Sequence, residues 1–185
     1  ARPYNPTNVA IAPNGDIYVA DGYGSYFVNQ YTSKAEYIRS FGGRGSEPGK
    51  LTEPHGIWVD TRGASPILVV ADRRNNRLQR FTMDGKHVDF ITGFRLPGHF
   101  DEFKGLVVVP DLQGRVTLLG PDNAMVAQLG DSNPPTGNPP LRREPRDQFI
   151  PGQFICPHGA CFDHDGNIFV VEWVEVGRVT KLRKV

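Results

Sequence analysis

The chain has 185 residues, and its 21 Lys and Arg against 20 Asp and Glu give a formal net charge of +1. This balance excludes the broad basic surface with which proteins bind nucleic acid or anionic lipid. No apolar run is long enough to span a membrane, so we expect neither a nucleic-acid partner nor a membrane span. With 21 Gly and 16 Pro the chain is rich in turns, but it stays below the range typical of disordered chains.

The first part of the chain consists of four short apolar or alternating segments separated by turns. Residues 8–11 and 17–20 flank a Pro-Asn-Gly-Asp turn, and residues 27–32 and 37–41 follow. Short strands joined by Gly- and Asp-containing turns are typical of an antiparallel sheet in which consecutive strands pair.

The same order of segments returns three more times. Its second strands start near residues 17, 67, 106 and 168, and the segments 48–56 (PGKLTEPHG) and 151–159 (PGQFICPHG) repeat one nine-residue motif. Four strands per repeat of roughly 50 residues are typical of a β-propeller blade. A two-sheet sandwich is the alternative, which the repeated motif disfavours.

The sequence therefore predicts an all-β chain, a β-propeller of four-stranded blades with about four blades. We expect a single propeller domain or fragment with blades at about residues 8–43, 55–93, 99–130 and 158–185. The first strand of the third blade is interrupted by Pro97, Gly98 and His99, so we expect it to be short or irregular. The last blade lacks a fourth strand, so we expect either that the chain is part of a six-bladed ring or that self-association covers its open blade edges.

A Pro-rich insert at 131–153 separates the last two blades. It contains six prolines and the basic residues Arg142, Arg143 and Arg146. One interpretation is a solvated surface loop, and the other is a loop that crosses the propeller face and shapes a pocket.

His55 and His158 occupy the same position in the two copies of the motif, just before the predicted innermost strand of a blade. Rotational repetition would aim both imidazoles at one axis, and imidazole is a common zinc ligand. The alternative is that each His hydrogen-bonds a neighbouring blade. His99 is a marginal third candidate, and we expect His87 and His164 to lie at the surface.

Two corners that follow second strands offer further candidates, Asp21-Gly22-Tyr23 and Asp72-Arg73. A Tyr hydroxyl beside a metal or a guanidinium loses its proton more easily, so Tyr23 is a candidate general base. Arg73 is a candidate to grip a substrate carboxylate. Alternatively, Asp21 and Asp72 bond backbone amides, and Tyr23 packs between blades.

Other repeated residues indicate scaffold roles. Arg77, Arg115 and Arg178 each open a third strand, which predicts that they pair with the acidic corners. Cys156 and Cys161 are five residues apart, and we expect two free, partly buried thiols rather than a disulfide, because so small a loop would add little stability.

The motif Pro-Gly-x-apolar-x-x-Pro-x-Gly, followed by the two strands and their Asn-Gly turn, resembles the NHL repeat over most of the chain. Within that group the sequence is most similar to peptidyl-α-hydroxyglycine α-amidating lyase. The resemblance implies a six-bladed propeller, of which this chain would form part, with a catalytic zinc on three His from Pro-His motifs and a structural calcium. It also implies a secreted or periplasmic setting.

Four positions match the family's functional motifs. His55 and His158 match two of its zinc-binding His, Tyr23 its catalytic Tyr and Arg73 an active-site Arg. The sequence departs from the family at Gly159, where the calcium-ligating motif has an acidic residue. The family's first zinc His and a second active-site Arg belong to blades upstream of those matched here, and two His ligands hold zinc far less well than three.

Three functions follow as hypotheses. The first is a zinc-dependent lyase that cleaves α-hydroxyglycine-type small-molecule or peptide substrates to an amide and glyoxylate. The second is a noncatalytic NHL propeller that binds a protein or ligand through the insert 131–153. The third is a lactonase-type propeller hydrolase with an axial calcium.

Overall fold

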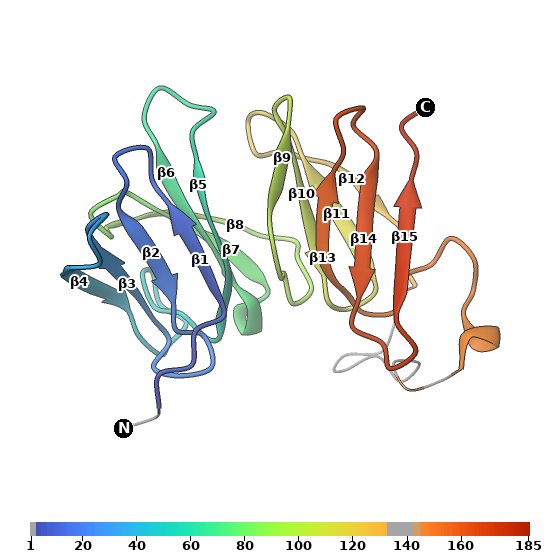
Figure 1. The fold of residues 1–185 in the computed structure, drawn as a ribbon, viewed down its shortest axis with the longest axis horizontal. Helices are drawn as coiled ribbons and strands as arrows, with labels where there is room; N and C mark the ends of the chain where they lie inside the picture. Colours follow the sequence, from blue (N-terminus) through green and yellow to red (C-terminus); the bar gives the residue numbers. More distant parts are fainter. Residues whose placement is uncertain (1–2, 133–142, 144) are drawn as a thin grey trace. The chain divides into compact units, whose positions relative to one another are not determined.

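The structure is a computed structural model that describes residues 3–132, 143 and 145–185. The chain divides into two compact units, residues 1–97 and residues 98–185. Each unit consists of antiparallel sheets in which consecutive strands pair, so the fold is all-β (Figure 1). The prediction of an all-β chain of β-propeller blades is confirmed, and each unit supplies two blades.

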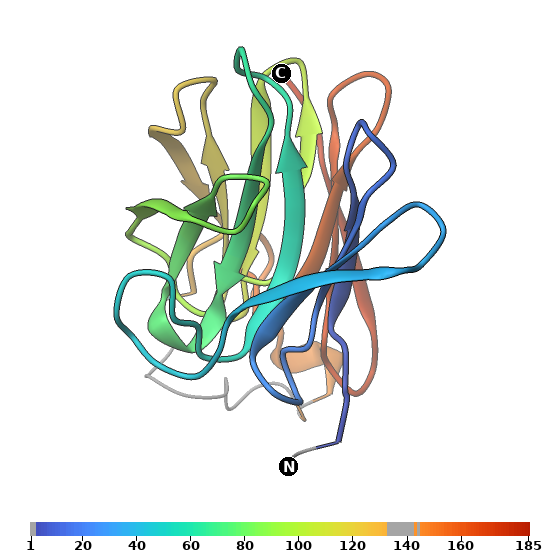
Figure 2. The same ribbon diagram turned by 90° about the vertical axis from the view of Figure 1, so that its left-hand side faces the viewer.

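Unit 1 contains two four-stranded blades. Blade 1 pairs its strands in the order β1-β2-β3-β4 and blade 2 in the order β5-β6-β7-β8, and Figure 2, which looks onto this unit, shows both as twisted meanders. The strands are β1 (Asn8–Ile11), β2 (Ile17–Ala20), β3 (Phe27–Tyr31), β4 (Tyr37–Gly42), β5 (Pro54–Asp60), β6 (Ile67–Asp72), β7 (Arg77–Phe81) and β8 (His87–Ile91). A single 3₁₀ turn, η1 (Arg73–Asn75), joins β6 to β7.

Unit 2 contains blade 3, in the order β12-β11-β10-β9, and blade 4, whose described strands pair as β13-β14-β15. The elements are β9 (Asp101–Phe103), β10 (Leu106–Asp111), β11 (Arg115–Leu119), β12 (Met125–Leu129), η3 (Arg146–Gln148), β13 (Pro157–Phe162), β14 (Ile168–Glu172) and β15 (Arg178–Leu182). β9 has three residues, which confirms the short first strand expected there. Within the insert 131–153, residues 133–142 and 144, Arg142 included, lie outside the described residues.

The two Pro-His-Gly motifs are placed differently from the prediction. β5 begins at Pro54 and β13 at Pro157, so both His lie inside a first strand rather than before it. The pairing shifts register between Pro54 and Ile57 and again between Pro157 and Gly159. The irregular backbone that Pro and Gly produce is therefore a bulge at the start of the strand.

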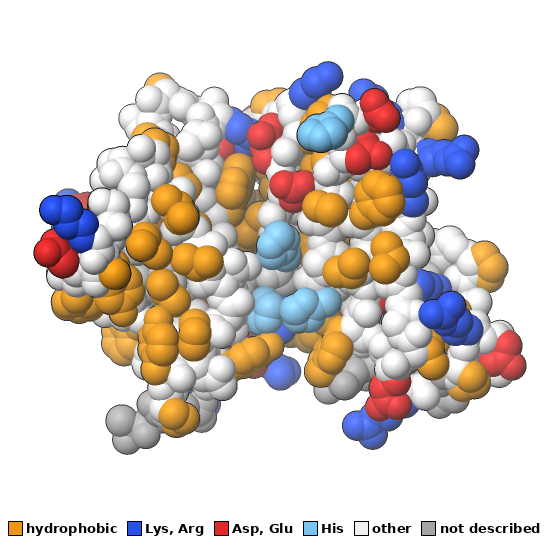
Figure 3. All heavy atoms as spheres, viewed as in Figure 1, with side chains coloured by type: hydrophobic (Ala, Val, Ile, Leu, Met, Phe, Trp, Pro, Cys, Tyr) orange, Lys and Arg blue, Asp and Glu red, His pale blue; other side chains and the backbone are white. Residues whose placement is uncertain are grey.

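Each unit has its own apolar core. In unit 1, side chains of blades 1 and 2 pack together, with Tyr18, Val28, Leu51, Leu68 and Phe81 among those that are almost fully buried. In unit 2, a second cluster joins blade 3 to blade 4. At the surface, Figure 3 shows hydrophobic side chains over blade 1, where Val9 and Ile11 on β1 are exposed.

A buried acid closes the second strand of every blade. These residues are Asp21, Asp72, Asp111 and Glu172. In blades 2 to 4 the acid pairs with the Arg that opens the third strand. The Arg77 Nε lies 2.8 Å from Asp72 Oδ2 and the Arg115 Nε 2.9 Å from Asp111 Oδ2, and Arg178 pairs with Glu172. The predicted scaffold role of the three arginines is confirmed.

The same acids hold the chain segment that enters their blade. Asp72 Oδ1 accepts the Thr52 N–H at 2.8 Å, Asp21 Oδ1 accepts the Asn5 N–H at 2.6 Å, and Glu172 Oε1 accepts the Ile155 N–H at 2.6 Å. Blade 1 has no Arg at this corner, and Ser25 donates its N–H and hydroxyl to Asp21 instead. Asp21, Asp72 and Glu172 thus each tie their corner to the strand entry beside it.

Two further expectations concern membranes and thiols. No helix among the described residues is long and apolar enough to cross a membrane. Cys156 and Cys161 are both free, as predicted, although Cys161 is exposed rather than partly buried.

Replacing Asp72 tests how much the corner stabilises the fold. Asp72→Ala removes the shared carboxylate that accepts from Arg77 Nε, Gln79 Nε2 and the Thr52 N–H. We expect the free energy of unfolding to fall by about 3–5 kcal/mol, because removing one partner leaves a buried charge uncompensated. Chemical denaturation of the full chain measures this. Lys34→Ala at an exposed turn is the control, and an equal loss in both variants would contradict the role of the corner.

Candidate functional site

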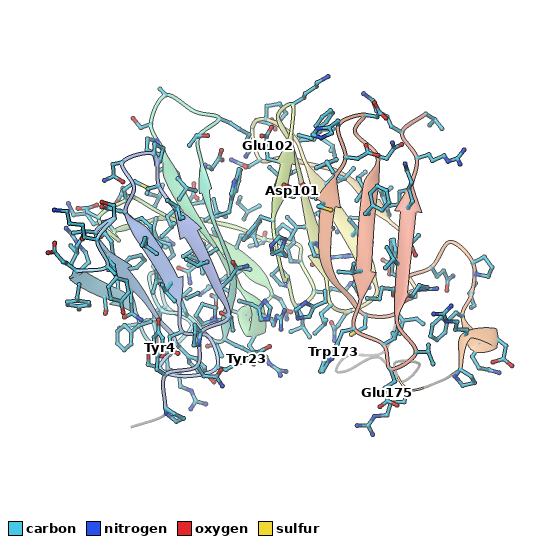
Figure 4. All side chains as sticks on the ribbon, in the orientation of Figure 1. Tyr4, Tyr23, Asp101, Glu102, Trp173 and Glu175 are labelled. Carbon is cyan, nitrogen blue, oxygen red and sulfur yellow. The ribbon has the colours of Figure 1, made fainter. Side chains whose placement is uncertain are left out.

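Three of the predicted site residues meet at one end of the blades in unit 1. The Tyr23 hydroxyl lies 3.1 Å from His55 Nε2 and 3.4 Å from Arg73 Nη1. The rings of Tyr23 and His55 meet edge to face, with centroids 5.7 Å apart. Figure 4 labels Tyr23 at this end of blade 1. Residues from a corner of blade 1, a first strand and a 3₁₀ turn thus share one hydrogen-bonded cluster.

Close backbone contact between the two blades brings Tyr23 to His55. A Cβ added to Gly22 would lie 1.8 Å from the Pro54 carbonyl oxygen, so only glycine fits at this position. The Thr7 hydroxyl donates to the same oxygen at 2.7 Å. The residues just before Tyr23 and just before His55 are therefore in direct contact.

Arg73 lies under this cluster and is 3% exposed. Its Nη1 faces the Tyr23 hydroxyl and the Glu53 carboxylate, whose Oε1 is 3.7 Å away, and its Nε donates to the Pro97 carbonyl at 3.4 Å. Among the described residues, its Nη2 has no hydrogen-bond partner. Burial lowers the pKa of Arg73, and the nearby Tyr23 and Glu53 oppose that shift. The site therefore holds a buried cation with an unused donor.

Glu53 is a member of this site that the sequence did not single out. Its carboxylate bridges two arginines, since Oε2 lies 2.9 Å from the Arg74 Nε while Oε1 faces Arg73. Its backbone is in the left-handed region, with φ of +58°. A non-glycine residue in this region is strained, and such strain is often found at functional sites. The strain cannot be recognised from the sequence. The only sequence signal for Glu53 was its position directly before the Pro-His motif.

The other candidate acids have structural roles. Asp21 accepts backbone N–H groups from Asn5 and Ser25, and Asp72 accepts the Thr52 N–H besides its side-chain donors. The alternative that they bond backbone amides is confirmed.

His158 lies in unit 2 and is half-buried at the start of β13. Its ring meets that of Trp173 edge to face, with centroids 6.4 Å apart, and Trp173 is 47% exposed. His99, the marginal candidate, hydrogen-bonds the backbone of Ala160 in the same unit.

The two histidines expected at the surface differ from each other. His164 is exposed, as predicted. The prediction for His87 was wrong, because the ring is half-buried on β8 beside Phe90, with centroids 4.6 Å apart, and beside Phe81. Although β8 is the outer strand of its blade, Phe90 on β8 and Phe81 on β7 cover the His87 ring.

The side chains that are present were compared with what zinc requires. A catalytic zinc usually has three protein ligands and one open position. Among the described residues, no group of three or more His, Cys, Asp or Glu could hold a metal ion. In unit 1, His55 contacts the Tyr23 phenol, which in turn contacts the buried Arg73 guanidinium. The positive charge of Arg73 disfavours a metal cation at that point. The cluster around His55 does not by itself form a zinc site.

Comparison with known proteins gives relatives but no family model, since none matches the chain. A probable peptidyl-alpha-hydroxyglycine alpha-amidating lyase of Caenorhabditis elegans is 34% identical over 79 residues, which cover 42% of this chain and 22% of that protein. Peptidyl-glycine alpha-amidating monooxygenase B of Xenopus laevis is 29% identical over 179 residues, 89% of this chain and 19% of that protein. An NHL repeat-containing protein of Homo sapiens is 32% identical over 82 residues, with 43% and 23% covered.

The chain spans less than a quarter of the length of each of these three relatives. Among solved structures, a Staphylococcus aureus virginiamycin B lyase superimposes with a TM-score of 0.64 at 14% identity, over all of this chain and 57% of that one. A Kuenenia stuttgartiensis hydrazine synthase superimposes with a TM-score of 0.69 at 10% identity, over 96% and 46%. At such low identity these likenesses support the fold alone. The chain is therefore a β-propeller whose sequence is similar to NHL-repeat proteins and to the peptidyl-α-hydroxyglycine α-amidating lyases.

Proposed function

We propose that the chain acts as a lyase on α-hydroxyglycine-type substrates, small molecules or peptides, with Tyr23 and Arg73 as catalytic residues. The observation that supports this most is the contact of the Tyr23 hydroxyl with both His55 Nε2 and Arg73 Nη1. The matched positions in the related lyases point to the same pair.

Arg73 would hold the substrate carboxylate. Its guanidinium is buried and its Nη2 lacks a partner among the described residues. A buried donor without an acceptor costs free energy, roughly 1–3 kcal/mol or more for a charged group, and a carboxylate removes that cost with a charge-assisted hydrogen bond. An anionic group next to the reacting carbon is the ligand that this site lacks.

Tyr23 would move the proton. Its oxygen accepts the proton of the substrate hydroxyl, the hydroxyl oxygen forms the carbonyl of glyoxylate, and the carbon–nitrogen bond breaks. The amide nitrogen then takes the proton back from Tyr23, so atoms and charges balance without an oxidant. Tyr23 would therefore act from its phenolate form, and the Arg73 cation, whose Nη1 lies 3.4 Å from that oxygen, would stabilise the negative charge that the oxygen carries before the first proton transfer and after the second.

Zinc is part of this proposal because the two Pro-His-Gly motifs match zinc-binding motifs of the related lyases. His55 and His158 are the proposed ligands. When bound, zinc would act as a Lewis acid that polarises the substrate. Because the cluster around His55 does not form a zinc site by itself, no step above depends on the metal. The calcium of the family is not proposed, because Gly159 replaces its acidic ligand.

The catalytic assignment is tested by glyoxylate release from a model α-hydroxyglycine peptide. We expect Tyr23→Phe to lower kcat by about 100-fold or more, in the range lost with a positioned general base. Arg73→Met should raise KM most strongly, because it removes the carboxylate contact. The matched control is Arg74→Met, which removes the exposed arginine that shares Glu53 and should change neither constant by more than about twofold. Full chain that releases no glyoxylate, or that is unaffected by Tyr23→Phe, would refute the assignment.

Metal content tests the two histidines separately from activity. We expect the purified full chain to hold zinc, and His55→Ala and His158→Ala each to hold less zinc than the parent chain, because each variant removes one proposed imidazole ligand. His164→Ala removes an exposed imidazole and is the control. Elemental analysis of the four proteins gives the answer. No zinc in the parent chain, or equal zinc in all four, would contradict the metal proposal.

A further inference from the structure

A second candidate site lies in unit 1, at the other end of β2 from Tyr23. It is a cleft of about 390 Å³ between blades 1 and 2. The turn between β1 and β2 forms one wall, with Pro13, Asn14 and Asp16, and residues of blade 2 form the other, with Pro66, Met83 and Asp84. Tyr18, Gln30 and Arg39 complete the lining. The cleft shares no residue with the proposed lyase site.

Hydrogen bonds across the two blades hold the cleft open at its present width. The Tyr18 hydroxyl donates to the Met83 carbonyl at 2.7 Å, and Arg39 Nη1 donates to the Asp84 carbonyl at 3.1 Å. Burial raises the pKa of Tyr18 to about 12, so its hydroxyl keeps the proton that it donates. Both of these donors are therefore already used within the protein.

Gln30 provides an acceptor that is not used. The side chain is 5% exposed, and its Nε2 donates to Asp16 Oδ2 at 2.8 Å. A carboxylate only accepts hydrogen bonds, so this contact fixes which end of the amide is nitrogen. The remaining atom, Oε1, is buried and has no partner among the described residues. Native proteins seldom leave a buried carbonyl in this state.

The charges near this acceptor favour a cation. Asp16 lies beside Gln30, and Asp84 stands on the opposite wall. Lys86, which is not part of the lining, pairs with Asp84 Oδ2 at 3.0 Å, and Arg39 on the lining donates to the Asp84 carbonyl. The Asp16 carboxylate together with Gln30 Oε1 thus forms an acceptor pair next to the apolar side chains of Pro13, Pro66 and Met83.

We propose that this cleft binds a small aliphatic primary amine as its ammonium ion. The ammonium group donates to Gln30 Oε1 and to Asp16, and the alkyl chain packs against the proline and methionine side chains. An ammonium has three donors and no acceptor, which matches a site whose buried donors, the Tyr18 hydroxyl and Gln30 Nε2, are already used while the buried acceptor Gln30 Oε1 is not.

The test is an amide NMR titration of the full chain with n-butylammonium chloride. Sodium butyrate and n-butanol are the matched probes, since they keep the alkyl chain and replace the charged donor. We expect saturable shifts at the backbone amides of Asp16, Gln30 and Met83 with the amine only. Asp16→Asn should weaken the binding at least tenfold, since it removes the charge and keeps the shape.

Two further variants make the result decisive. Gln30→Leu should also weaken amine binding, provided that its melting curve shows a folded chain. Asp163→Asn alters the corresponding turn of blade 4 and should leave the affinity unchanged. The absence of saturable shifts, equal shifts with butanol, or an unchanged affinity in Asp16→Asn would overturn the proposal. None of these results bears on glyoxylate release, so the two proposals fail independently.

Discussion

The buried acid at the end of each second strand is the interaction on which the rest of the structure depends. A four-stranded meander leaves its strand entries and its corners as separate pieces of backbone at one end of the sheet. A carboxylate has room to accept several hydrogen bonds, and in blade 2 Asp72 accepts from Thr52, Asn75, Arg77 and Gln79. One fully buried side chain thus connects the strand entry, the corner and the third strand.

The same acids determine where the reactive side chains lie. Asp72 is the neighbour of Arg73, and the N–H that it accepts belongs to Thr52, three residues before His55. Asp21 stands two residues before Tyr23 and holds Asn5 and Ser25 on either side of that corner. The contact of Tyr23 with His55 is therefore a consequence of two scaffold corners together with the close approach at Gly22.

The sequence predicted the parts of this arrangement that repeat. The strands of all four blades, the short first strand of blade 3 and the pairing of Arg77, Arg115 and Arg178 with acids all follow from a pattern seen several times in one chain. Repetition works as a predictor because equivalent positions meet the same backbone environment. The same reasoning selected Tyr23, His55 and Arg73.

The features that could not be predicted from the sequence each occur only once in the chain. Glu53 depends on a left-handed backbone and on pairing with the two arginines of the η1 turn, and no repeat or spacing in the sequence indicates either feature. His87 was expected at the surface because it lies on an outer strand, but its burial depends on Phe81 and Phe90, whose positions are set by tertiary packing. Features that depend on a single contact between blades can be identified only from the structure.

Two buried polar atoms without a hydrogen-bond partner among the described residues lie in the two proposed binding sites. Arg73 Nη2 and Gln30 Oε1 lie toward opposite ends of the blades in unit 1, the first in a guanidinium that contacts the Tyr23 hydroxyl and the second in an amide that donates to Asp16. Either atom left unsatisfied costs roughly 1–3 kcal/mol, which the corner networks offset as long as they stay intact. Because a ligand that supplies the missing partner recovers this free energy only in the folded state, binding at either site and folding of unit 1 are thermodynamically linked.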